Sequence, residues 1–180
     1  SGRLRPAPGT WGSLAAVLGW ALILALTATP FSTWALSHPS HPRISLYGLL
    51  LEVFLLALPI GMTWVAVRAS DLVVRETGLK DPSYIVADEW AGQWIALWPL
   101  RWFLAQNLFR LGRPGGWKIV LLLALPFAMF RLLDIWKPWP CHQIQSLPGG
   151  QGVVADDVVA GLYAIPLVMV LHPLAASFLH

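Results

Sequence analysis

The sequence predicts an all-α integral membrane protein, in which a single domain over residues 1–180 forms a bundle of about five membrane-embedded helices. The composition is 57% hydrophobic and only 12% charged, whereas an ordinary soluble domain is about 25% charged. Several apolar stretches are long enough to cross a bilayer, which takes about 20 helical residues. The chain also has 11 tryptophans, a residue that favours the membrane–water interface. No stretch alternates like a β-barrel strand, so helices are the expected spanning structure.

Five apolar stretches are expected to form the helices, and polar or turn-forming residues separate them. In chain order, the stretches cover approximately residues 14–36, 46–67, 88–106, 117–136 and 153–179. Residues 8–13 form a turn-rich entry, in which Thr10 and Ser13 can cap the first helix. Pro99 and Arg101 weaken the third stretch as a straight span. Pro138 ends the fourth, because proline cannot continue a helix.

Two polar features interrupt this pattern. Residues 68–87 are the most polar part of the chain, and Arg68, Asp71 and Arg75 share a helical face there. We interpret these three residues as an exposed, salt-bridged helix face. Glu52 is a lone acid inside the second stretch, where it is either a buried partner of another group or a residue near the interface.

Most of the other carboxylates gather at the ends of the apolar stretches. Asp81, Asp88 and Glu89 precede or open the third stretch, Asp134 closes the fourth, and Asp156 and Asp157 open the fifth. A carboxylate at the edge of the hydrocarbon is costly unless it is paired, hydrated or bound to a metal. With five crossings, all of these ends and residues 10–13 lie on one membrane face. We therefore expect a single site assembled from three acidic patches.

The chemistry of this acidic site favours a hard divalent cation. Several carboxylates without a nearby thiolate or histidine cluster suit Mg²⁺, which takes oxygen ligands and keeps several waters. The competing interpretation is that the acids are solvated residues at helix N-termini, stabilised by the helix dipole. Arg131, Asp134 and Lys137 share one helical face. They form either a salt-bridged helix end or a metal ligand between two cations that hold an anionic substrate.

Several other functions are disfavoured. The net charge of +3 is too small to indicate nucleic-acid binding, although it is compatible with an anionic lipid surface. The single cysteine, Cys141, excludes an internal disulfide and a cysteine-rich zinc site. No Gly-Lys-Ser/Thr phosphate-binding loop is present, and no arginine follows Cys141 as a cysteine-based phosphatase loop requires.

Four sequence blocks, taken together, resemble the phosphatidylglycerophosphatase A family. They are residues 8–13 (PGTWGS), 81–92 (DPSYIVADEWAG), 130–140 (FRLLDIWKPWP) and 149–161 (GGQGVVADDVVAG). The resemblance covers about residues 6–165, with the blocks in the family order. It implies a bacterial, Mg²⁺-dependent phosphatase of the cytoplasmic membrane. Such an enzyme removes the terminal phosphate of phosphatidylglycerophosphate and releases phosphatidylglycerol.

The resemblance also implies a set of site residues. The implied acidic, metal-binding site consists of Asp81, Asp88, Glu89, Asp134, Asp156 and Asp157, all but Asp81 being catalytic candidates. Around the phosphate it implies Thr10, Gly12, Ser13, Arg131 and Lys137. Residues 142–147 lack the acidic and basic pair often found in the family, so no role is assigned to them. Which acid binds metal, which acts as base, and whether a covalent intermediate forms stay open.

Two other functional classes compete with a lipid phosphatase. In a cation or proton transporter, the carboxylates would line a pathway through the membrane. Such a pathway needs acids at several depths, and here only Glu52 departs from one level. A structural membrane subunit would give no reason for so many acids beside Arg131 and Lys137.

Overall fold

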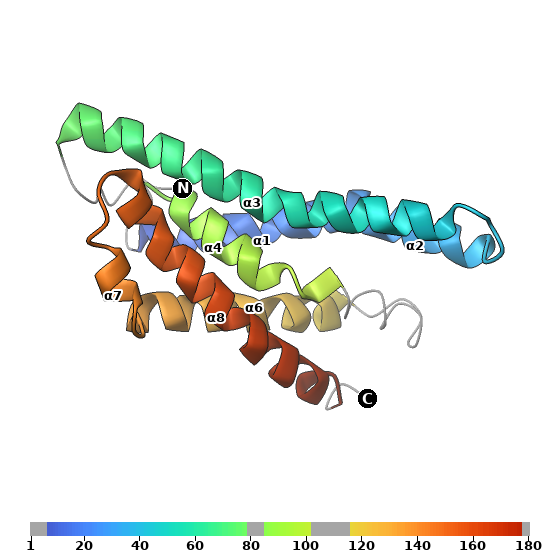
Figure 1. Cartoon of the computed structure of the whole chain (residues 1–180). Helices are drawn as coiled ribbons and strands as arrows, with labels where there is room; N and C mark the ends of the chain where they lie inside the picture. The colour runs from blue at the N-terminus through green and yellow to red at the C-terminus, as the bar shows by residue number, and fades with distance from the viewer. Residues whose placement is uncertain (1–6, 79–84, 102–115, 178–180) are drawn as a thin grey trace.

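The computed structural model describes residues 7–78, 85–101 and 116–177, and within them the chain is helical with no strand. The helices, shown in Figure 1, are α1 (Pro8–Leu26), α2 (Ala28–Ser37), α3 (Ile44–Thr77), α4 (Ala87–Leu97), α6 (Gly116–Trp136), α7 (Cys141–Ile144) and α8 (Gly150–Ser177). The predicted all-α class is therefore confirmed. Asp81 lies outside the described residues.

Four helical segments are long and apolar enough to cross a membrane. They are Pro8–Ser37, which joins α1 and α2, and then Ile44–Thr77, Ile119–Trp136 and Gly150–Leu174. Their outward faces carry large apolar side chains such as Leu18, Ile60 and Val170, each more than 60% exposed. An exposed apolar surface on every long helix is the surface that lipid chains cover. The chain is an integral membrane protein.

The first helix begins earlier than the sequence suggested. It begins at Pro8, because proline is favoured in the first turn, where its missing N–H removes no hydrogen bond. Residues 8–13 are therefore helical, and the residue before the helix is Ala7, which has a positive φ of 64°. No side chain caps this terminus, so the capping expected of Thr10 and Ser13 is wrong. A break at Thr27, whose hydroxyl bonds to the Ile23 carbonyl, separates α1 from α2.

The second and third expected segments also differ in length. Helix α3 has 34 residues and continues to Thr77, ten residues beyond the expected end, before Gly78 stops it with a φ of 68°. At about 1.5 Å per residue it is roughly 51 Å long, which exceeds a hydrocarbon core of about 30 Å. Helix α4 has 11 residues and ends before a turn at Trp98 and Pro99. Residues 102–106 of the third expected segment lie beyond the described residues.

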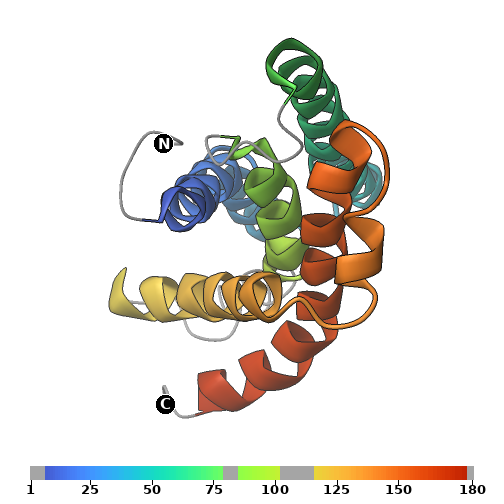
Figure 2. The ribbon, with the colours of Figure 1, turned by 90° about the vertical axis from the view of Figure 1, so that its left-hand side faces the viewer.

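Helix α4 is the central element of the bundle, because it contacts α1, α3, α6 and α8. Figures 1 and 2 show the start of α1, the end of α3, the start of α4, the end of α6 and the start of α8 gathered at one end of the molecule. The core beside α4 contains Trp20 and Trp94, whose rings lie 5.7 Å apart. The Trp94 indole donates a hydrogen bond to the Ala16 carbonyl at 3.0 Å. This ring therefore serves packing within the bundle.

Helices α4 and α8 cross at two glycines without room for a side chain. A Cβ added to Gly92 would overlap the Asp157 carbonyl and lie 2.5 Å from the Phe130 ring. A Cβ added to Gly161 would overlap the Gly92 carbonyl oxygen. Small residues let helix backbones approach closely in membranes. This contact brings the start of α8 beside the start of α4, where the acids are.

Glu52 proves to be an ion-pair partner. Its carboxylate pairs with Arg101, whose side chain is only 6% exposed and whose guanidinium lies 4.4 Å from the Trp98 ring centre. An arginine surrounded by apolar side chains requires a counter-charge. Glu52 supplies that charge at a level of the bundle distant from the acidic ends of the helices.

Candidate active site

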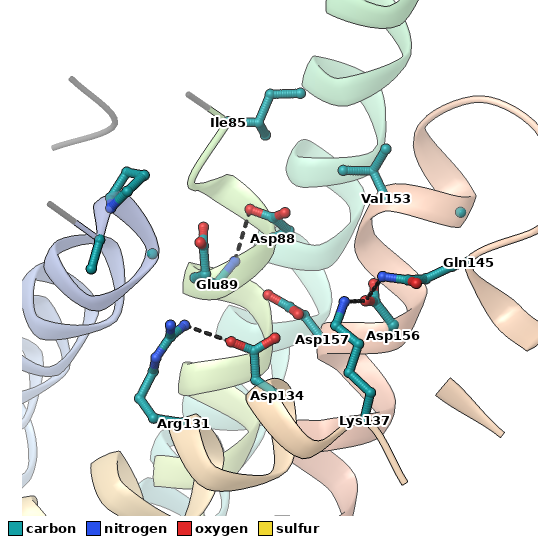
Figure 3. A pocket seen from close by; sticks show the side chains of 14 residues that line it. Ile85, Asp88, Glu89, Arg131, Asp134, Lys137, Gln145, Val153, Asp156 and Asp157 are labelled. Atoms are coloured by element: carbon teal, nitrogen blue, oxygen red, sulfur yellow. Dashed lines mark hydrogen bonds and ion pairs between the residues drawn. The ribbon is translucent and has the colours of Figure 1, made fainter. Parts of the chain in front are cut away.

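Five carboxylates and two cations line one cavity of about 520 Å³ at the end of the bundle, drawn in Figure 3. The acids are Asp88, Glu89, Asp134, Asp156 and Asp157, and the cations are Arg131 and Lys137. Ala7, the first two residues of α1 and Gln145 complete much of the remaining wall. Four helices thus contribute to one cavity, and the structure brings together the three acidic patches that the sequence suggested would meet.

Three of these acids are close enough to share one ion. Asp88, Glu89 and Asp157 each offer a carboxylate oxygen, and these oxygens lie within 4.8 Å of one another. Asp88 and Glu89 lie in the first turn of α4, where the helix dipole favours negative charge. The Asp88 carboxylate also accepts the Glu89 backbone N–H at 3.0 Å. Asp157 reaches them from α8 through the close crossing at Gly92.

The pKa of Glu89 reflects its burial and the crowding of negative charge around it. Burial, followed by the neighbouring Asp88, raises the pKa of Glu89 to about 9. Its Oε2 atom is buried and has no hydrogen-bond partner among the described residues. A buried carboxylate beside other carboxylates is stabilised by a cation that restores its charged form. An all-oxygen donor set of this kind fits a hard divalent metal ion such as Mg²⁺.

Asp134 is held by the cation one helical turn before it. Arg131 donates from Nη1 to Asp134 Oδ2 at 2.6 Å, and both side chains are mostly buried. Asp134 also lies within hydrogen-bonding reach of Asp157. The guanidinium is close to the start of α1, because a Cβ on Gly9 would lie 3.1 Å from Arg131 Nη1 and would overlap Glu89 Oε1. A glycine at position 9 therefore leaves room for both side chains.

Asp156 is held by two donors from the chain that follows α6. Lys137 donates from Nζ to Asp156 Oδ2 at 2.5 Å, and Gln145 donates from Nε2 to the same oxygen at 2.6 Å. Burial opposes the charged amine, but the hydrogen bond and the nearby acids raise the pKa of Lys137 above its usual value. Lys137 also has a positive φ of 48°, which is unfavourable for a residue with a Cβ.

The total charge of the cavity constrains what can enter it. With all five carboxylates ionised, as a bound divalent cation would favour, the acids and the two cations carry a formal charge of −3, and protonation of Glu89 lowers this to −2. A phosphate monoester carries nearly two negative charges at neutral pH. It would be repelled unless further positive charge is bound in the cavity. The cavity can therefore accept a phosphate together with a divalent metal ion.

The structure places the other phosphate-binding residues implied by the resemblance outside the cavity. Thr10 is exposed, and Gly12 and Ser13 are buried, so none of the three lines the cavity. Gly12 instead gives α1 close contact with α4, since its Cβ would lie 3.0 Å from Val86 Cβ. Sequence reasoning missed Gln145, because a glutamine in a loop carries no periodic or motif signal.

Replacing Gln145 with alanine is expected to lower catalytic turnover about tenfold, because hydrogen bonds that orient a charged site residue are worth about 10- to 100-fold. Gln145→Glu is expected to be worse, since it places another carboxylate against Asp156. Steady-state phosphate release measures both effects. Gln143→Ala, an exposed glutamine in the same segment, is the matched control, and equal activity of the Gln145 and Gln143 variants would contradict the role.

Comparison with known proteins identifies the family. A family model described as Phosphatidylglycerophosphatase A matches residues 1–172. The chain is 34% identical over 156 residues to Phosphatidylglycerophosphatase A of Escherichia coli (strain K12), covering 86% of this chain and 68% of the relative. It is 28% identical over 174 residues to Phosphatidylglycerophosphatase A of Haemophilus influenzae, covering 96% of this chain and 83% of the relative.

A third relative has a different name. The chain is 29% identical over 168 residues to a Bacteroides thetaiotaomicron protein called "Putative phosphatidylinositol-3-phosphatase", covering 91% of this chain and 82% of the relative. No solved structure matches the chain. The family match over nearly the whole chain agrees with the acidic cavity and with the sequence blocks that contribute to it. The chain belongs to the phosphatidylglycerophosphatase A family and is a phosphatase.

Proposed function

We propose that this protein is a Mg²⁺-dependent phosphatase that hydrolyses phosphatidylglycerophosphate to phosphatidylglycerol and phosphate at the cytoplasmic face of a bacterial inner membrane. The observation that carries this proposal is the cavity at one end of a membrane-embedded bundle, lined by five carboxylates and two cations. A lipid phosphate reaches such a position from the bilayer surface without leaving the membrane. The E. coli relative carries the name of this activity.

The residues divide into two groups in the proposed reaction. Asp88, Glu89 and Asp157 would hold Mg²⁺, whose chemistry is to polarise a phosphoryl oxygen and to favour hydroxide formation from a bound water. Arg131 and Lys137 would offset charge on the phosphoryl oxygens. Asp134 and Asp156 orient these two cations through the ion pairs described above.

The overall reaction is a hydrolysis. A water oxygen forms a bond to the terminal phosphorus, and the bond from that phosphorus to the glycerol oxygen breaks. A carboxylate of the cavity takes the proton of the water and returns it to the departing oxygen. The partly buried cavity limits competition by bulk water for the cationic side chains.

The cytoplasmic orientation is supported by the distribution of basic residues. Arg68 and Arg75 lie on the part of α3 that approaches the cavity end, together with Arg131 and Lys137. Basic residues are enriched on the cytoplasmic side of membrane proteins. Among the described residues, Arg43, directly before α3, and Lys118, in the first turn of α6, lie toward the opposite end, and Arg101 is paired with Glu52, so the excess of basic residues at the cavity end is small.

The transporter alternative is less favoured by the structure. The cavity acids lie at one end of the bundle. Glu52 lies farther along the bundle and is paired with Arg101. Within the described ranges, no further carboxylate connects these two levels. A conduction pathway would need such a series.

The direct test is phosphate release by the purified protein in mixed micelles. We expect release from phosphatidylglycerophosphate, loss of release in EDTA, and recovery when Mg²⁺ is added. Phosphatidylinositol 3-phosphate is the comparison substrate, because the B. thetaiotaomicron relative is named for it. Faster release from that lipid would contradict the proposed substrate, and undiminished turnover in EDTA would contradict the metal requirement.

A further inference from the structure

Asp71 lies outside the acidic cavity but contacts the helix that carries two of its carboxylates. Its Oδ1 atom accepts the backbone N–H of Gly150 at 2.5 Å, a contact between the end of α3 and the first residue of α8. The first amides of a helix have no partner within the helix, and a carboxylate there also interacts favourably with the dipole. Asp71 thus satisfies one of these amides from a neighbouring helix.

The chain at this contact has glycines where a side chain would not fit. Gly149 has a φ of 66°, and a Cβ on it would overlap Asp71 Oδ1. A Cβ on Gly150 would overlap the Val67 carbonyl and lie 2.6 Å from the Asp71 backbone nitrogen. The start of α8 is therefore pressed against the backbone of α3, and the carboxylate of Asp71 closes the contact.

The contact is one of several that hold the catalytic part of α8. Another close backbone contact is the crossing of Gly161 with Gly92 on α4. The two contacts are 11 residues apart in the sequence, or about 16 Å along a helix axis. Asp156 and Asp157 lie between them. Fixing a helix at two points sets both its rotation and its position along the axis, which decide where these two carboxylates lie.

The exposed salt-bridged face expected for this part of the chain does not form. Among the described residues, no ion pair joins Asp71 to Arg68 or Arg75. The Arg68 guanidinium instead lies 5.3 Å from the centre of the Trp64 ring. The Asp71 carboxylate instead accepts the backbone N–H of Gly150 at the start of α8.

We infer that Asp71 is a positioning residue of the phosphatase, which holds the N-terminus of α8 so that Asp156 and Asp157 are correctly placed in the cavity. This inference rests on the proposed function. Asp71 does not line the cavity and touches none of the reacting groups. Its effect is transmitted through the backbone of α8.

The test compares Asp71→Ala with Asp71→Asn in the purified full-length protein. The alanine variant is expected to lose at least about tenfold in kcat and to need a higher Mg²⁺ concentration for half-activation. Asn keeps an oxygen that can accept the Gly150 N–H, so its kcat is expected to stay within about threefold of wild type. Glu76→Ala, an exposed acid on the same end of α3, is the control and should behave as wild type.

A second readout does not depend on activity. Hydrogen exchange of the backbone amides in residues 150–157 is expected to be faster in Asp71→Ala than in Glu76→Ala, with the core of α6 unchanged. Wild-type kcat in Asp71→Ala, or an activity loss explained entirely by unfolded protein, would overturn the inference. An inactive wild-type protein would contradict the proposed function, while slower exchange at residues 150–157 in the wild type than in Asp71→Ala would still support the contact.

Discussion

Replacing Asp157 with asparagine is expected to reduce phosphate release about 1,000-fold or more, since losing the charge of a residue that acts within a catalytic group typically costs more than the 10- to 100-fold of an orienting residue. Asp157 is 4% exposed, and its carboxylate is grouped with those of Asp88 and Glu89. Asparagine keeps the shape but removes the negative charge that a metal ion requires. It also points an NH₂ group toward neighbouring carboxylates or the metal position.

The same substitution is expected to preserve or increase the stability of the metal-free protein. Like charges crowded in a buried site repel one another, and removing one relieves that repulsion. Thermal unfolding in EDTA should therefore give a Tm at least as high as that of wild type, while phosphate release is lost. A lowered Tm with proportional loss of activity would show that Asp157 is needed only for folding.

Replacing Lys137 with alanine is expected to reduce kcat about 100-fold, because it removes one of two cations in the cavity and leaves Asp156 without its charged partner. Lys137→Arg should recover activity only in part, since a planar guanidinium does not replace a compact amine in a fixed geometry. Steady-state kinetics of the purified variants measure both effects. Arg43→Ala, at an exposed position near the opposite end, is the control.

Replacing Lys137 with glycine distinguishes the effect of losing the lysine side chain from the effect of backbone strain at this position. Lys137 has a φ of 48°, a conformation that costs a residue with a Cβ about 1–2 kcal/mol and costs glycine little. Lys137→Gly should therefore be more stable than Lys137→Ala, yet equally inactive. Normal activity in either variant would show that the helix face with Arg131, Asp134 and Lys137 is only a salt-bridged helix end.

The sequence predicted two kinds of feature well: helix ends that are followed by proline, and charged residues at the ends of apolar stretches. Pro138 follows α6 closely, so the expected segment 117–136 differs from Gly116–Trp136 by a single residue. The acids could be grouped because each lies at the end of an apolar stretch, and alternate crossings place such ends on one face. Both inferences need only helix length, proline chemistry and the cost of a charge in hydrocarbon.

Contacts between distant parts of the chain could not be predicted in the same way. Glu52 with Arg101, and Asp71 with Gly150, join residues that no local periodicity relates. The early start of α1 at Pro8 depends on a proline that also suits a turn. Gln145 reaches Asp156 only because the chain folds back after α6. Tertiary packing decides these features, and propensity does not encode it.

In the proposed function, Asp88, Glu89 and Asp157 would hold the divalent ion on which activity depends. The most direct measurement is an electron paramagnetic resonance titration of the purified protein with Mn²⁺, with Mg²⁺ as competitor and phosphate release followed on the same samples. We expect wild type to bind Mn²⁺ in competition with Mg²⁺, and Asp157→Asn to lose this binding together with activity while Glu76→Gln keeps both. Equal Mn²⁺ binding by wild type and Asp157→Asn would contradict this expectation.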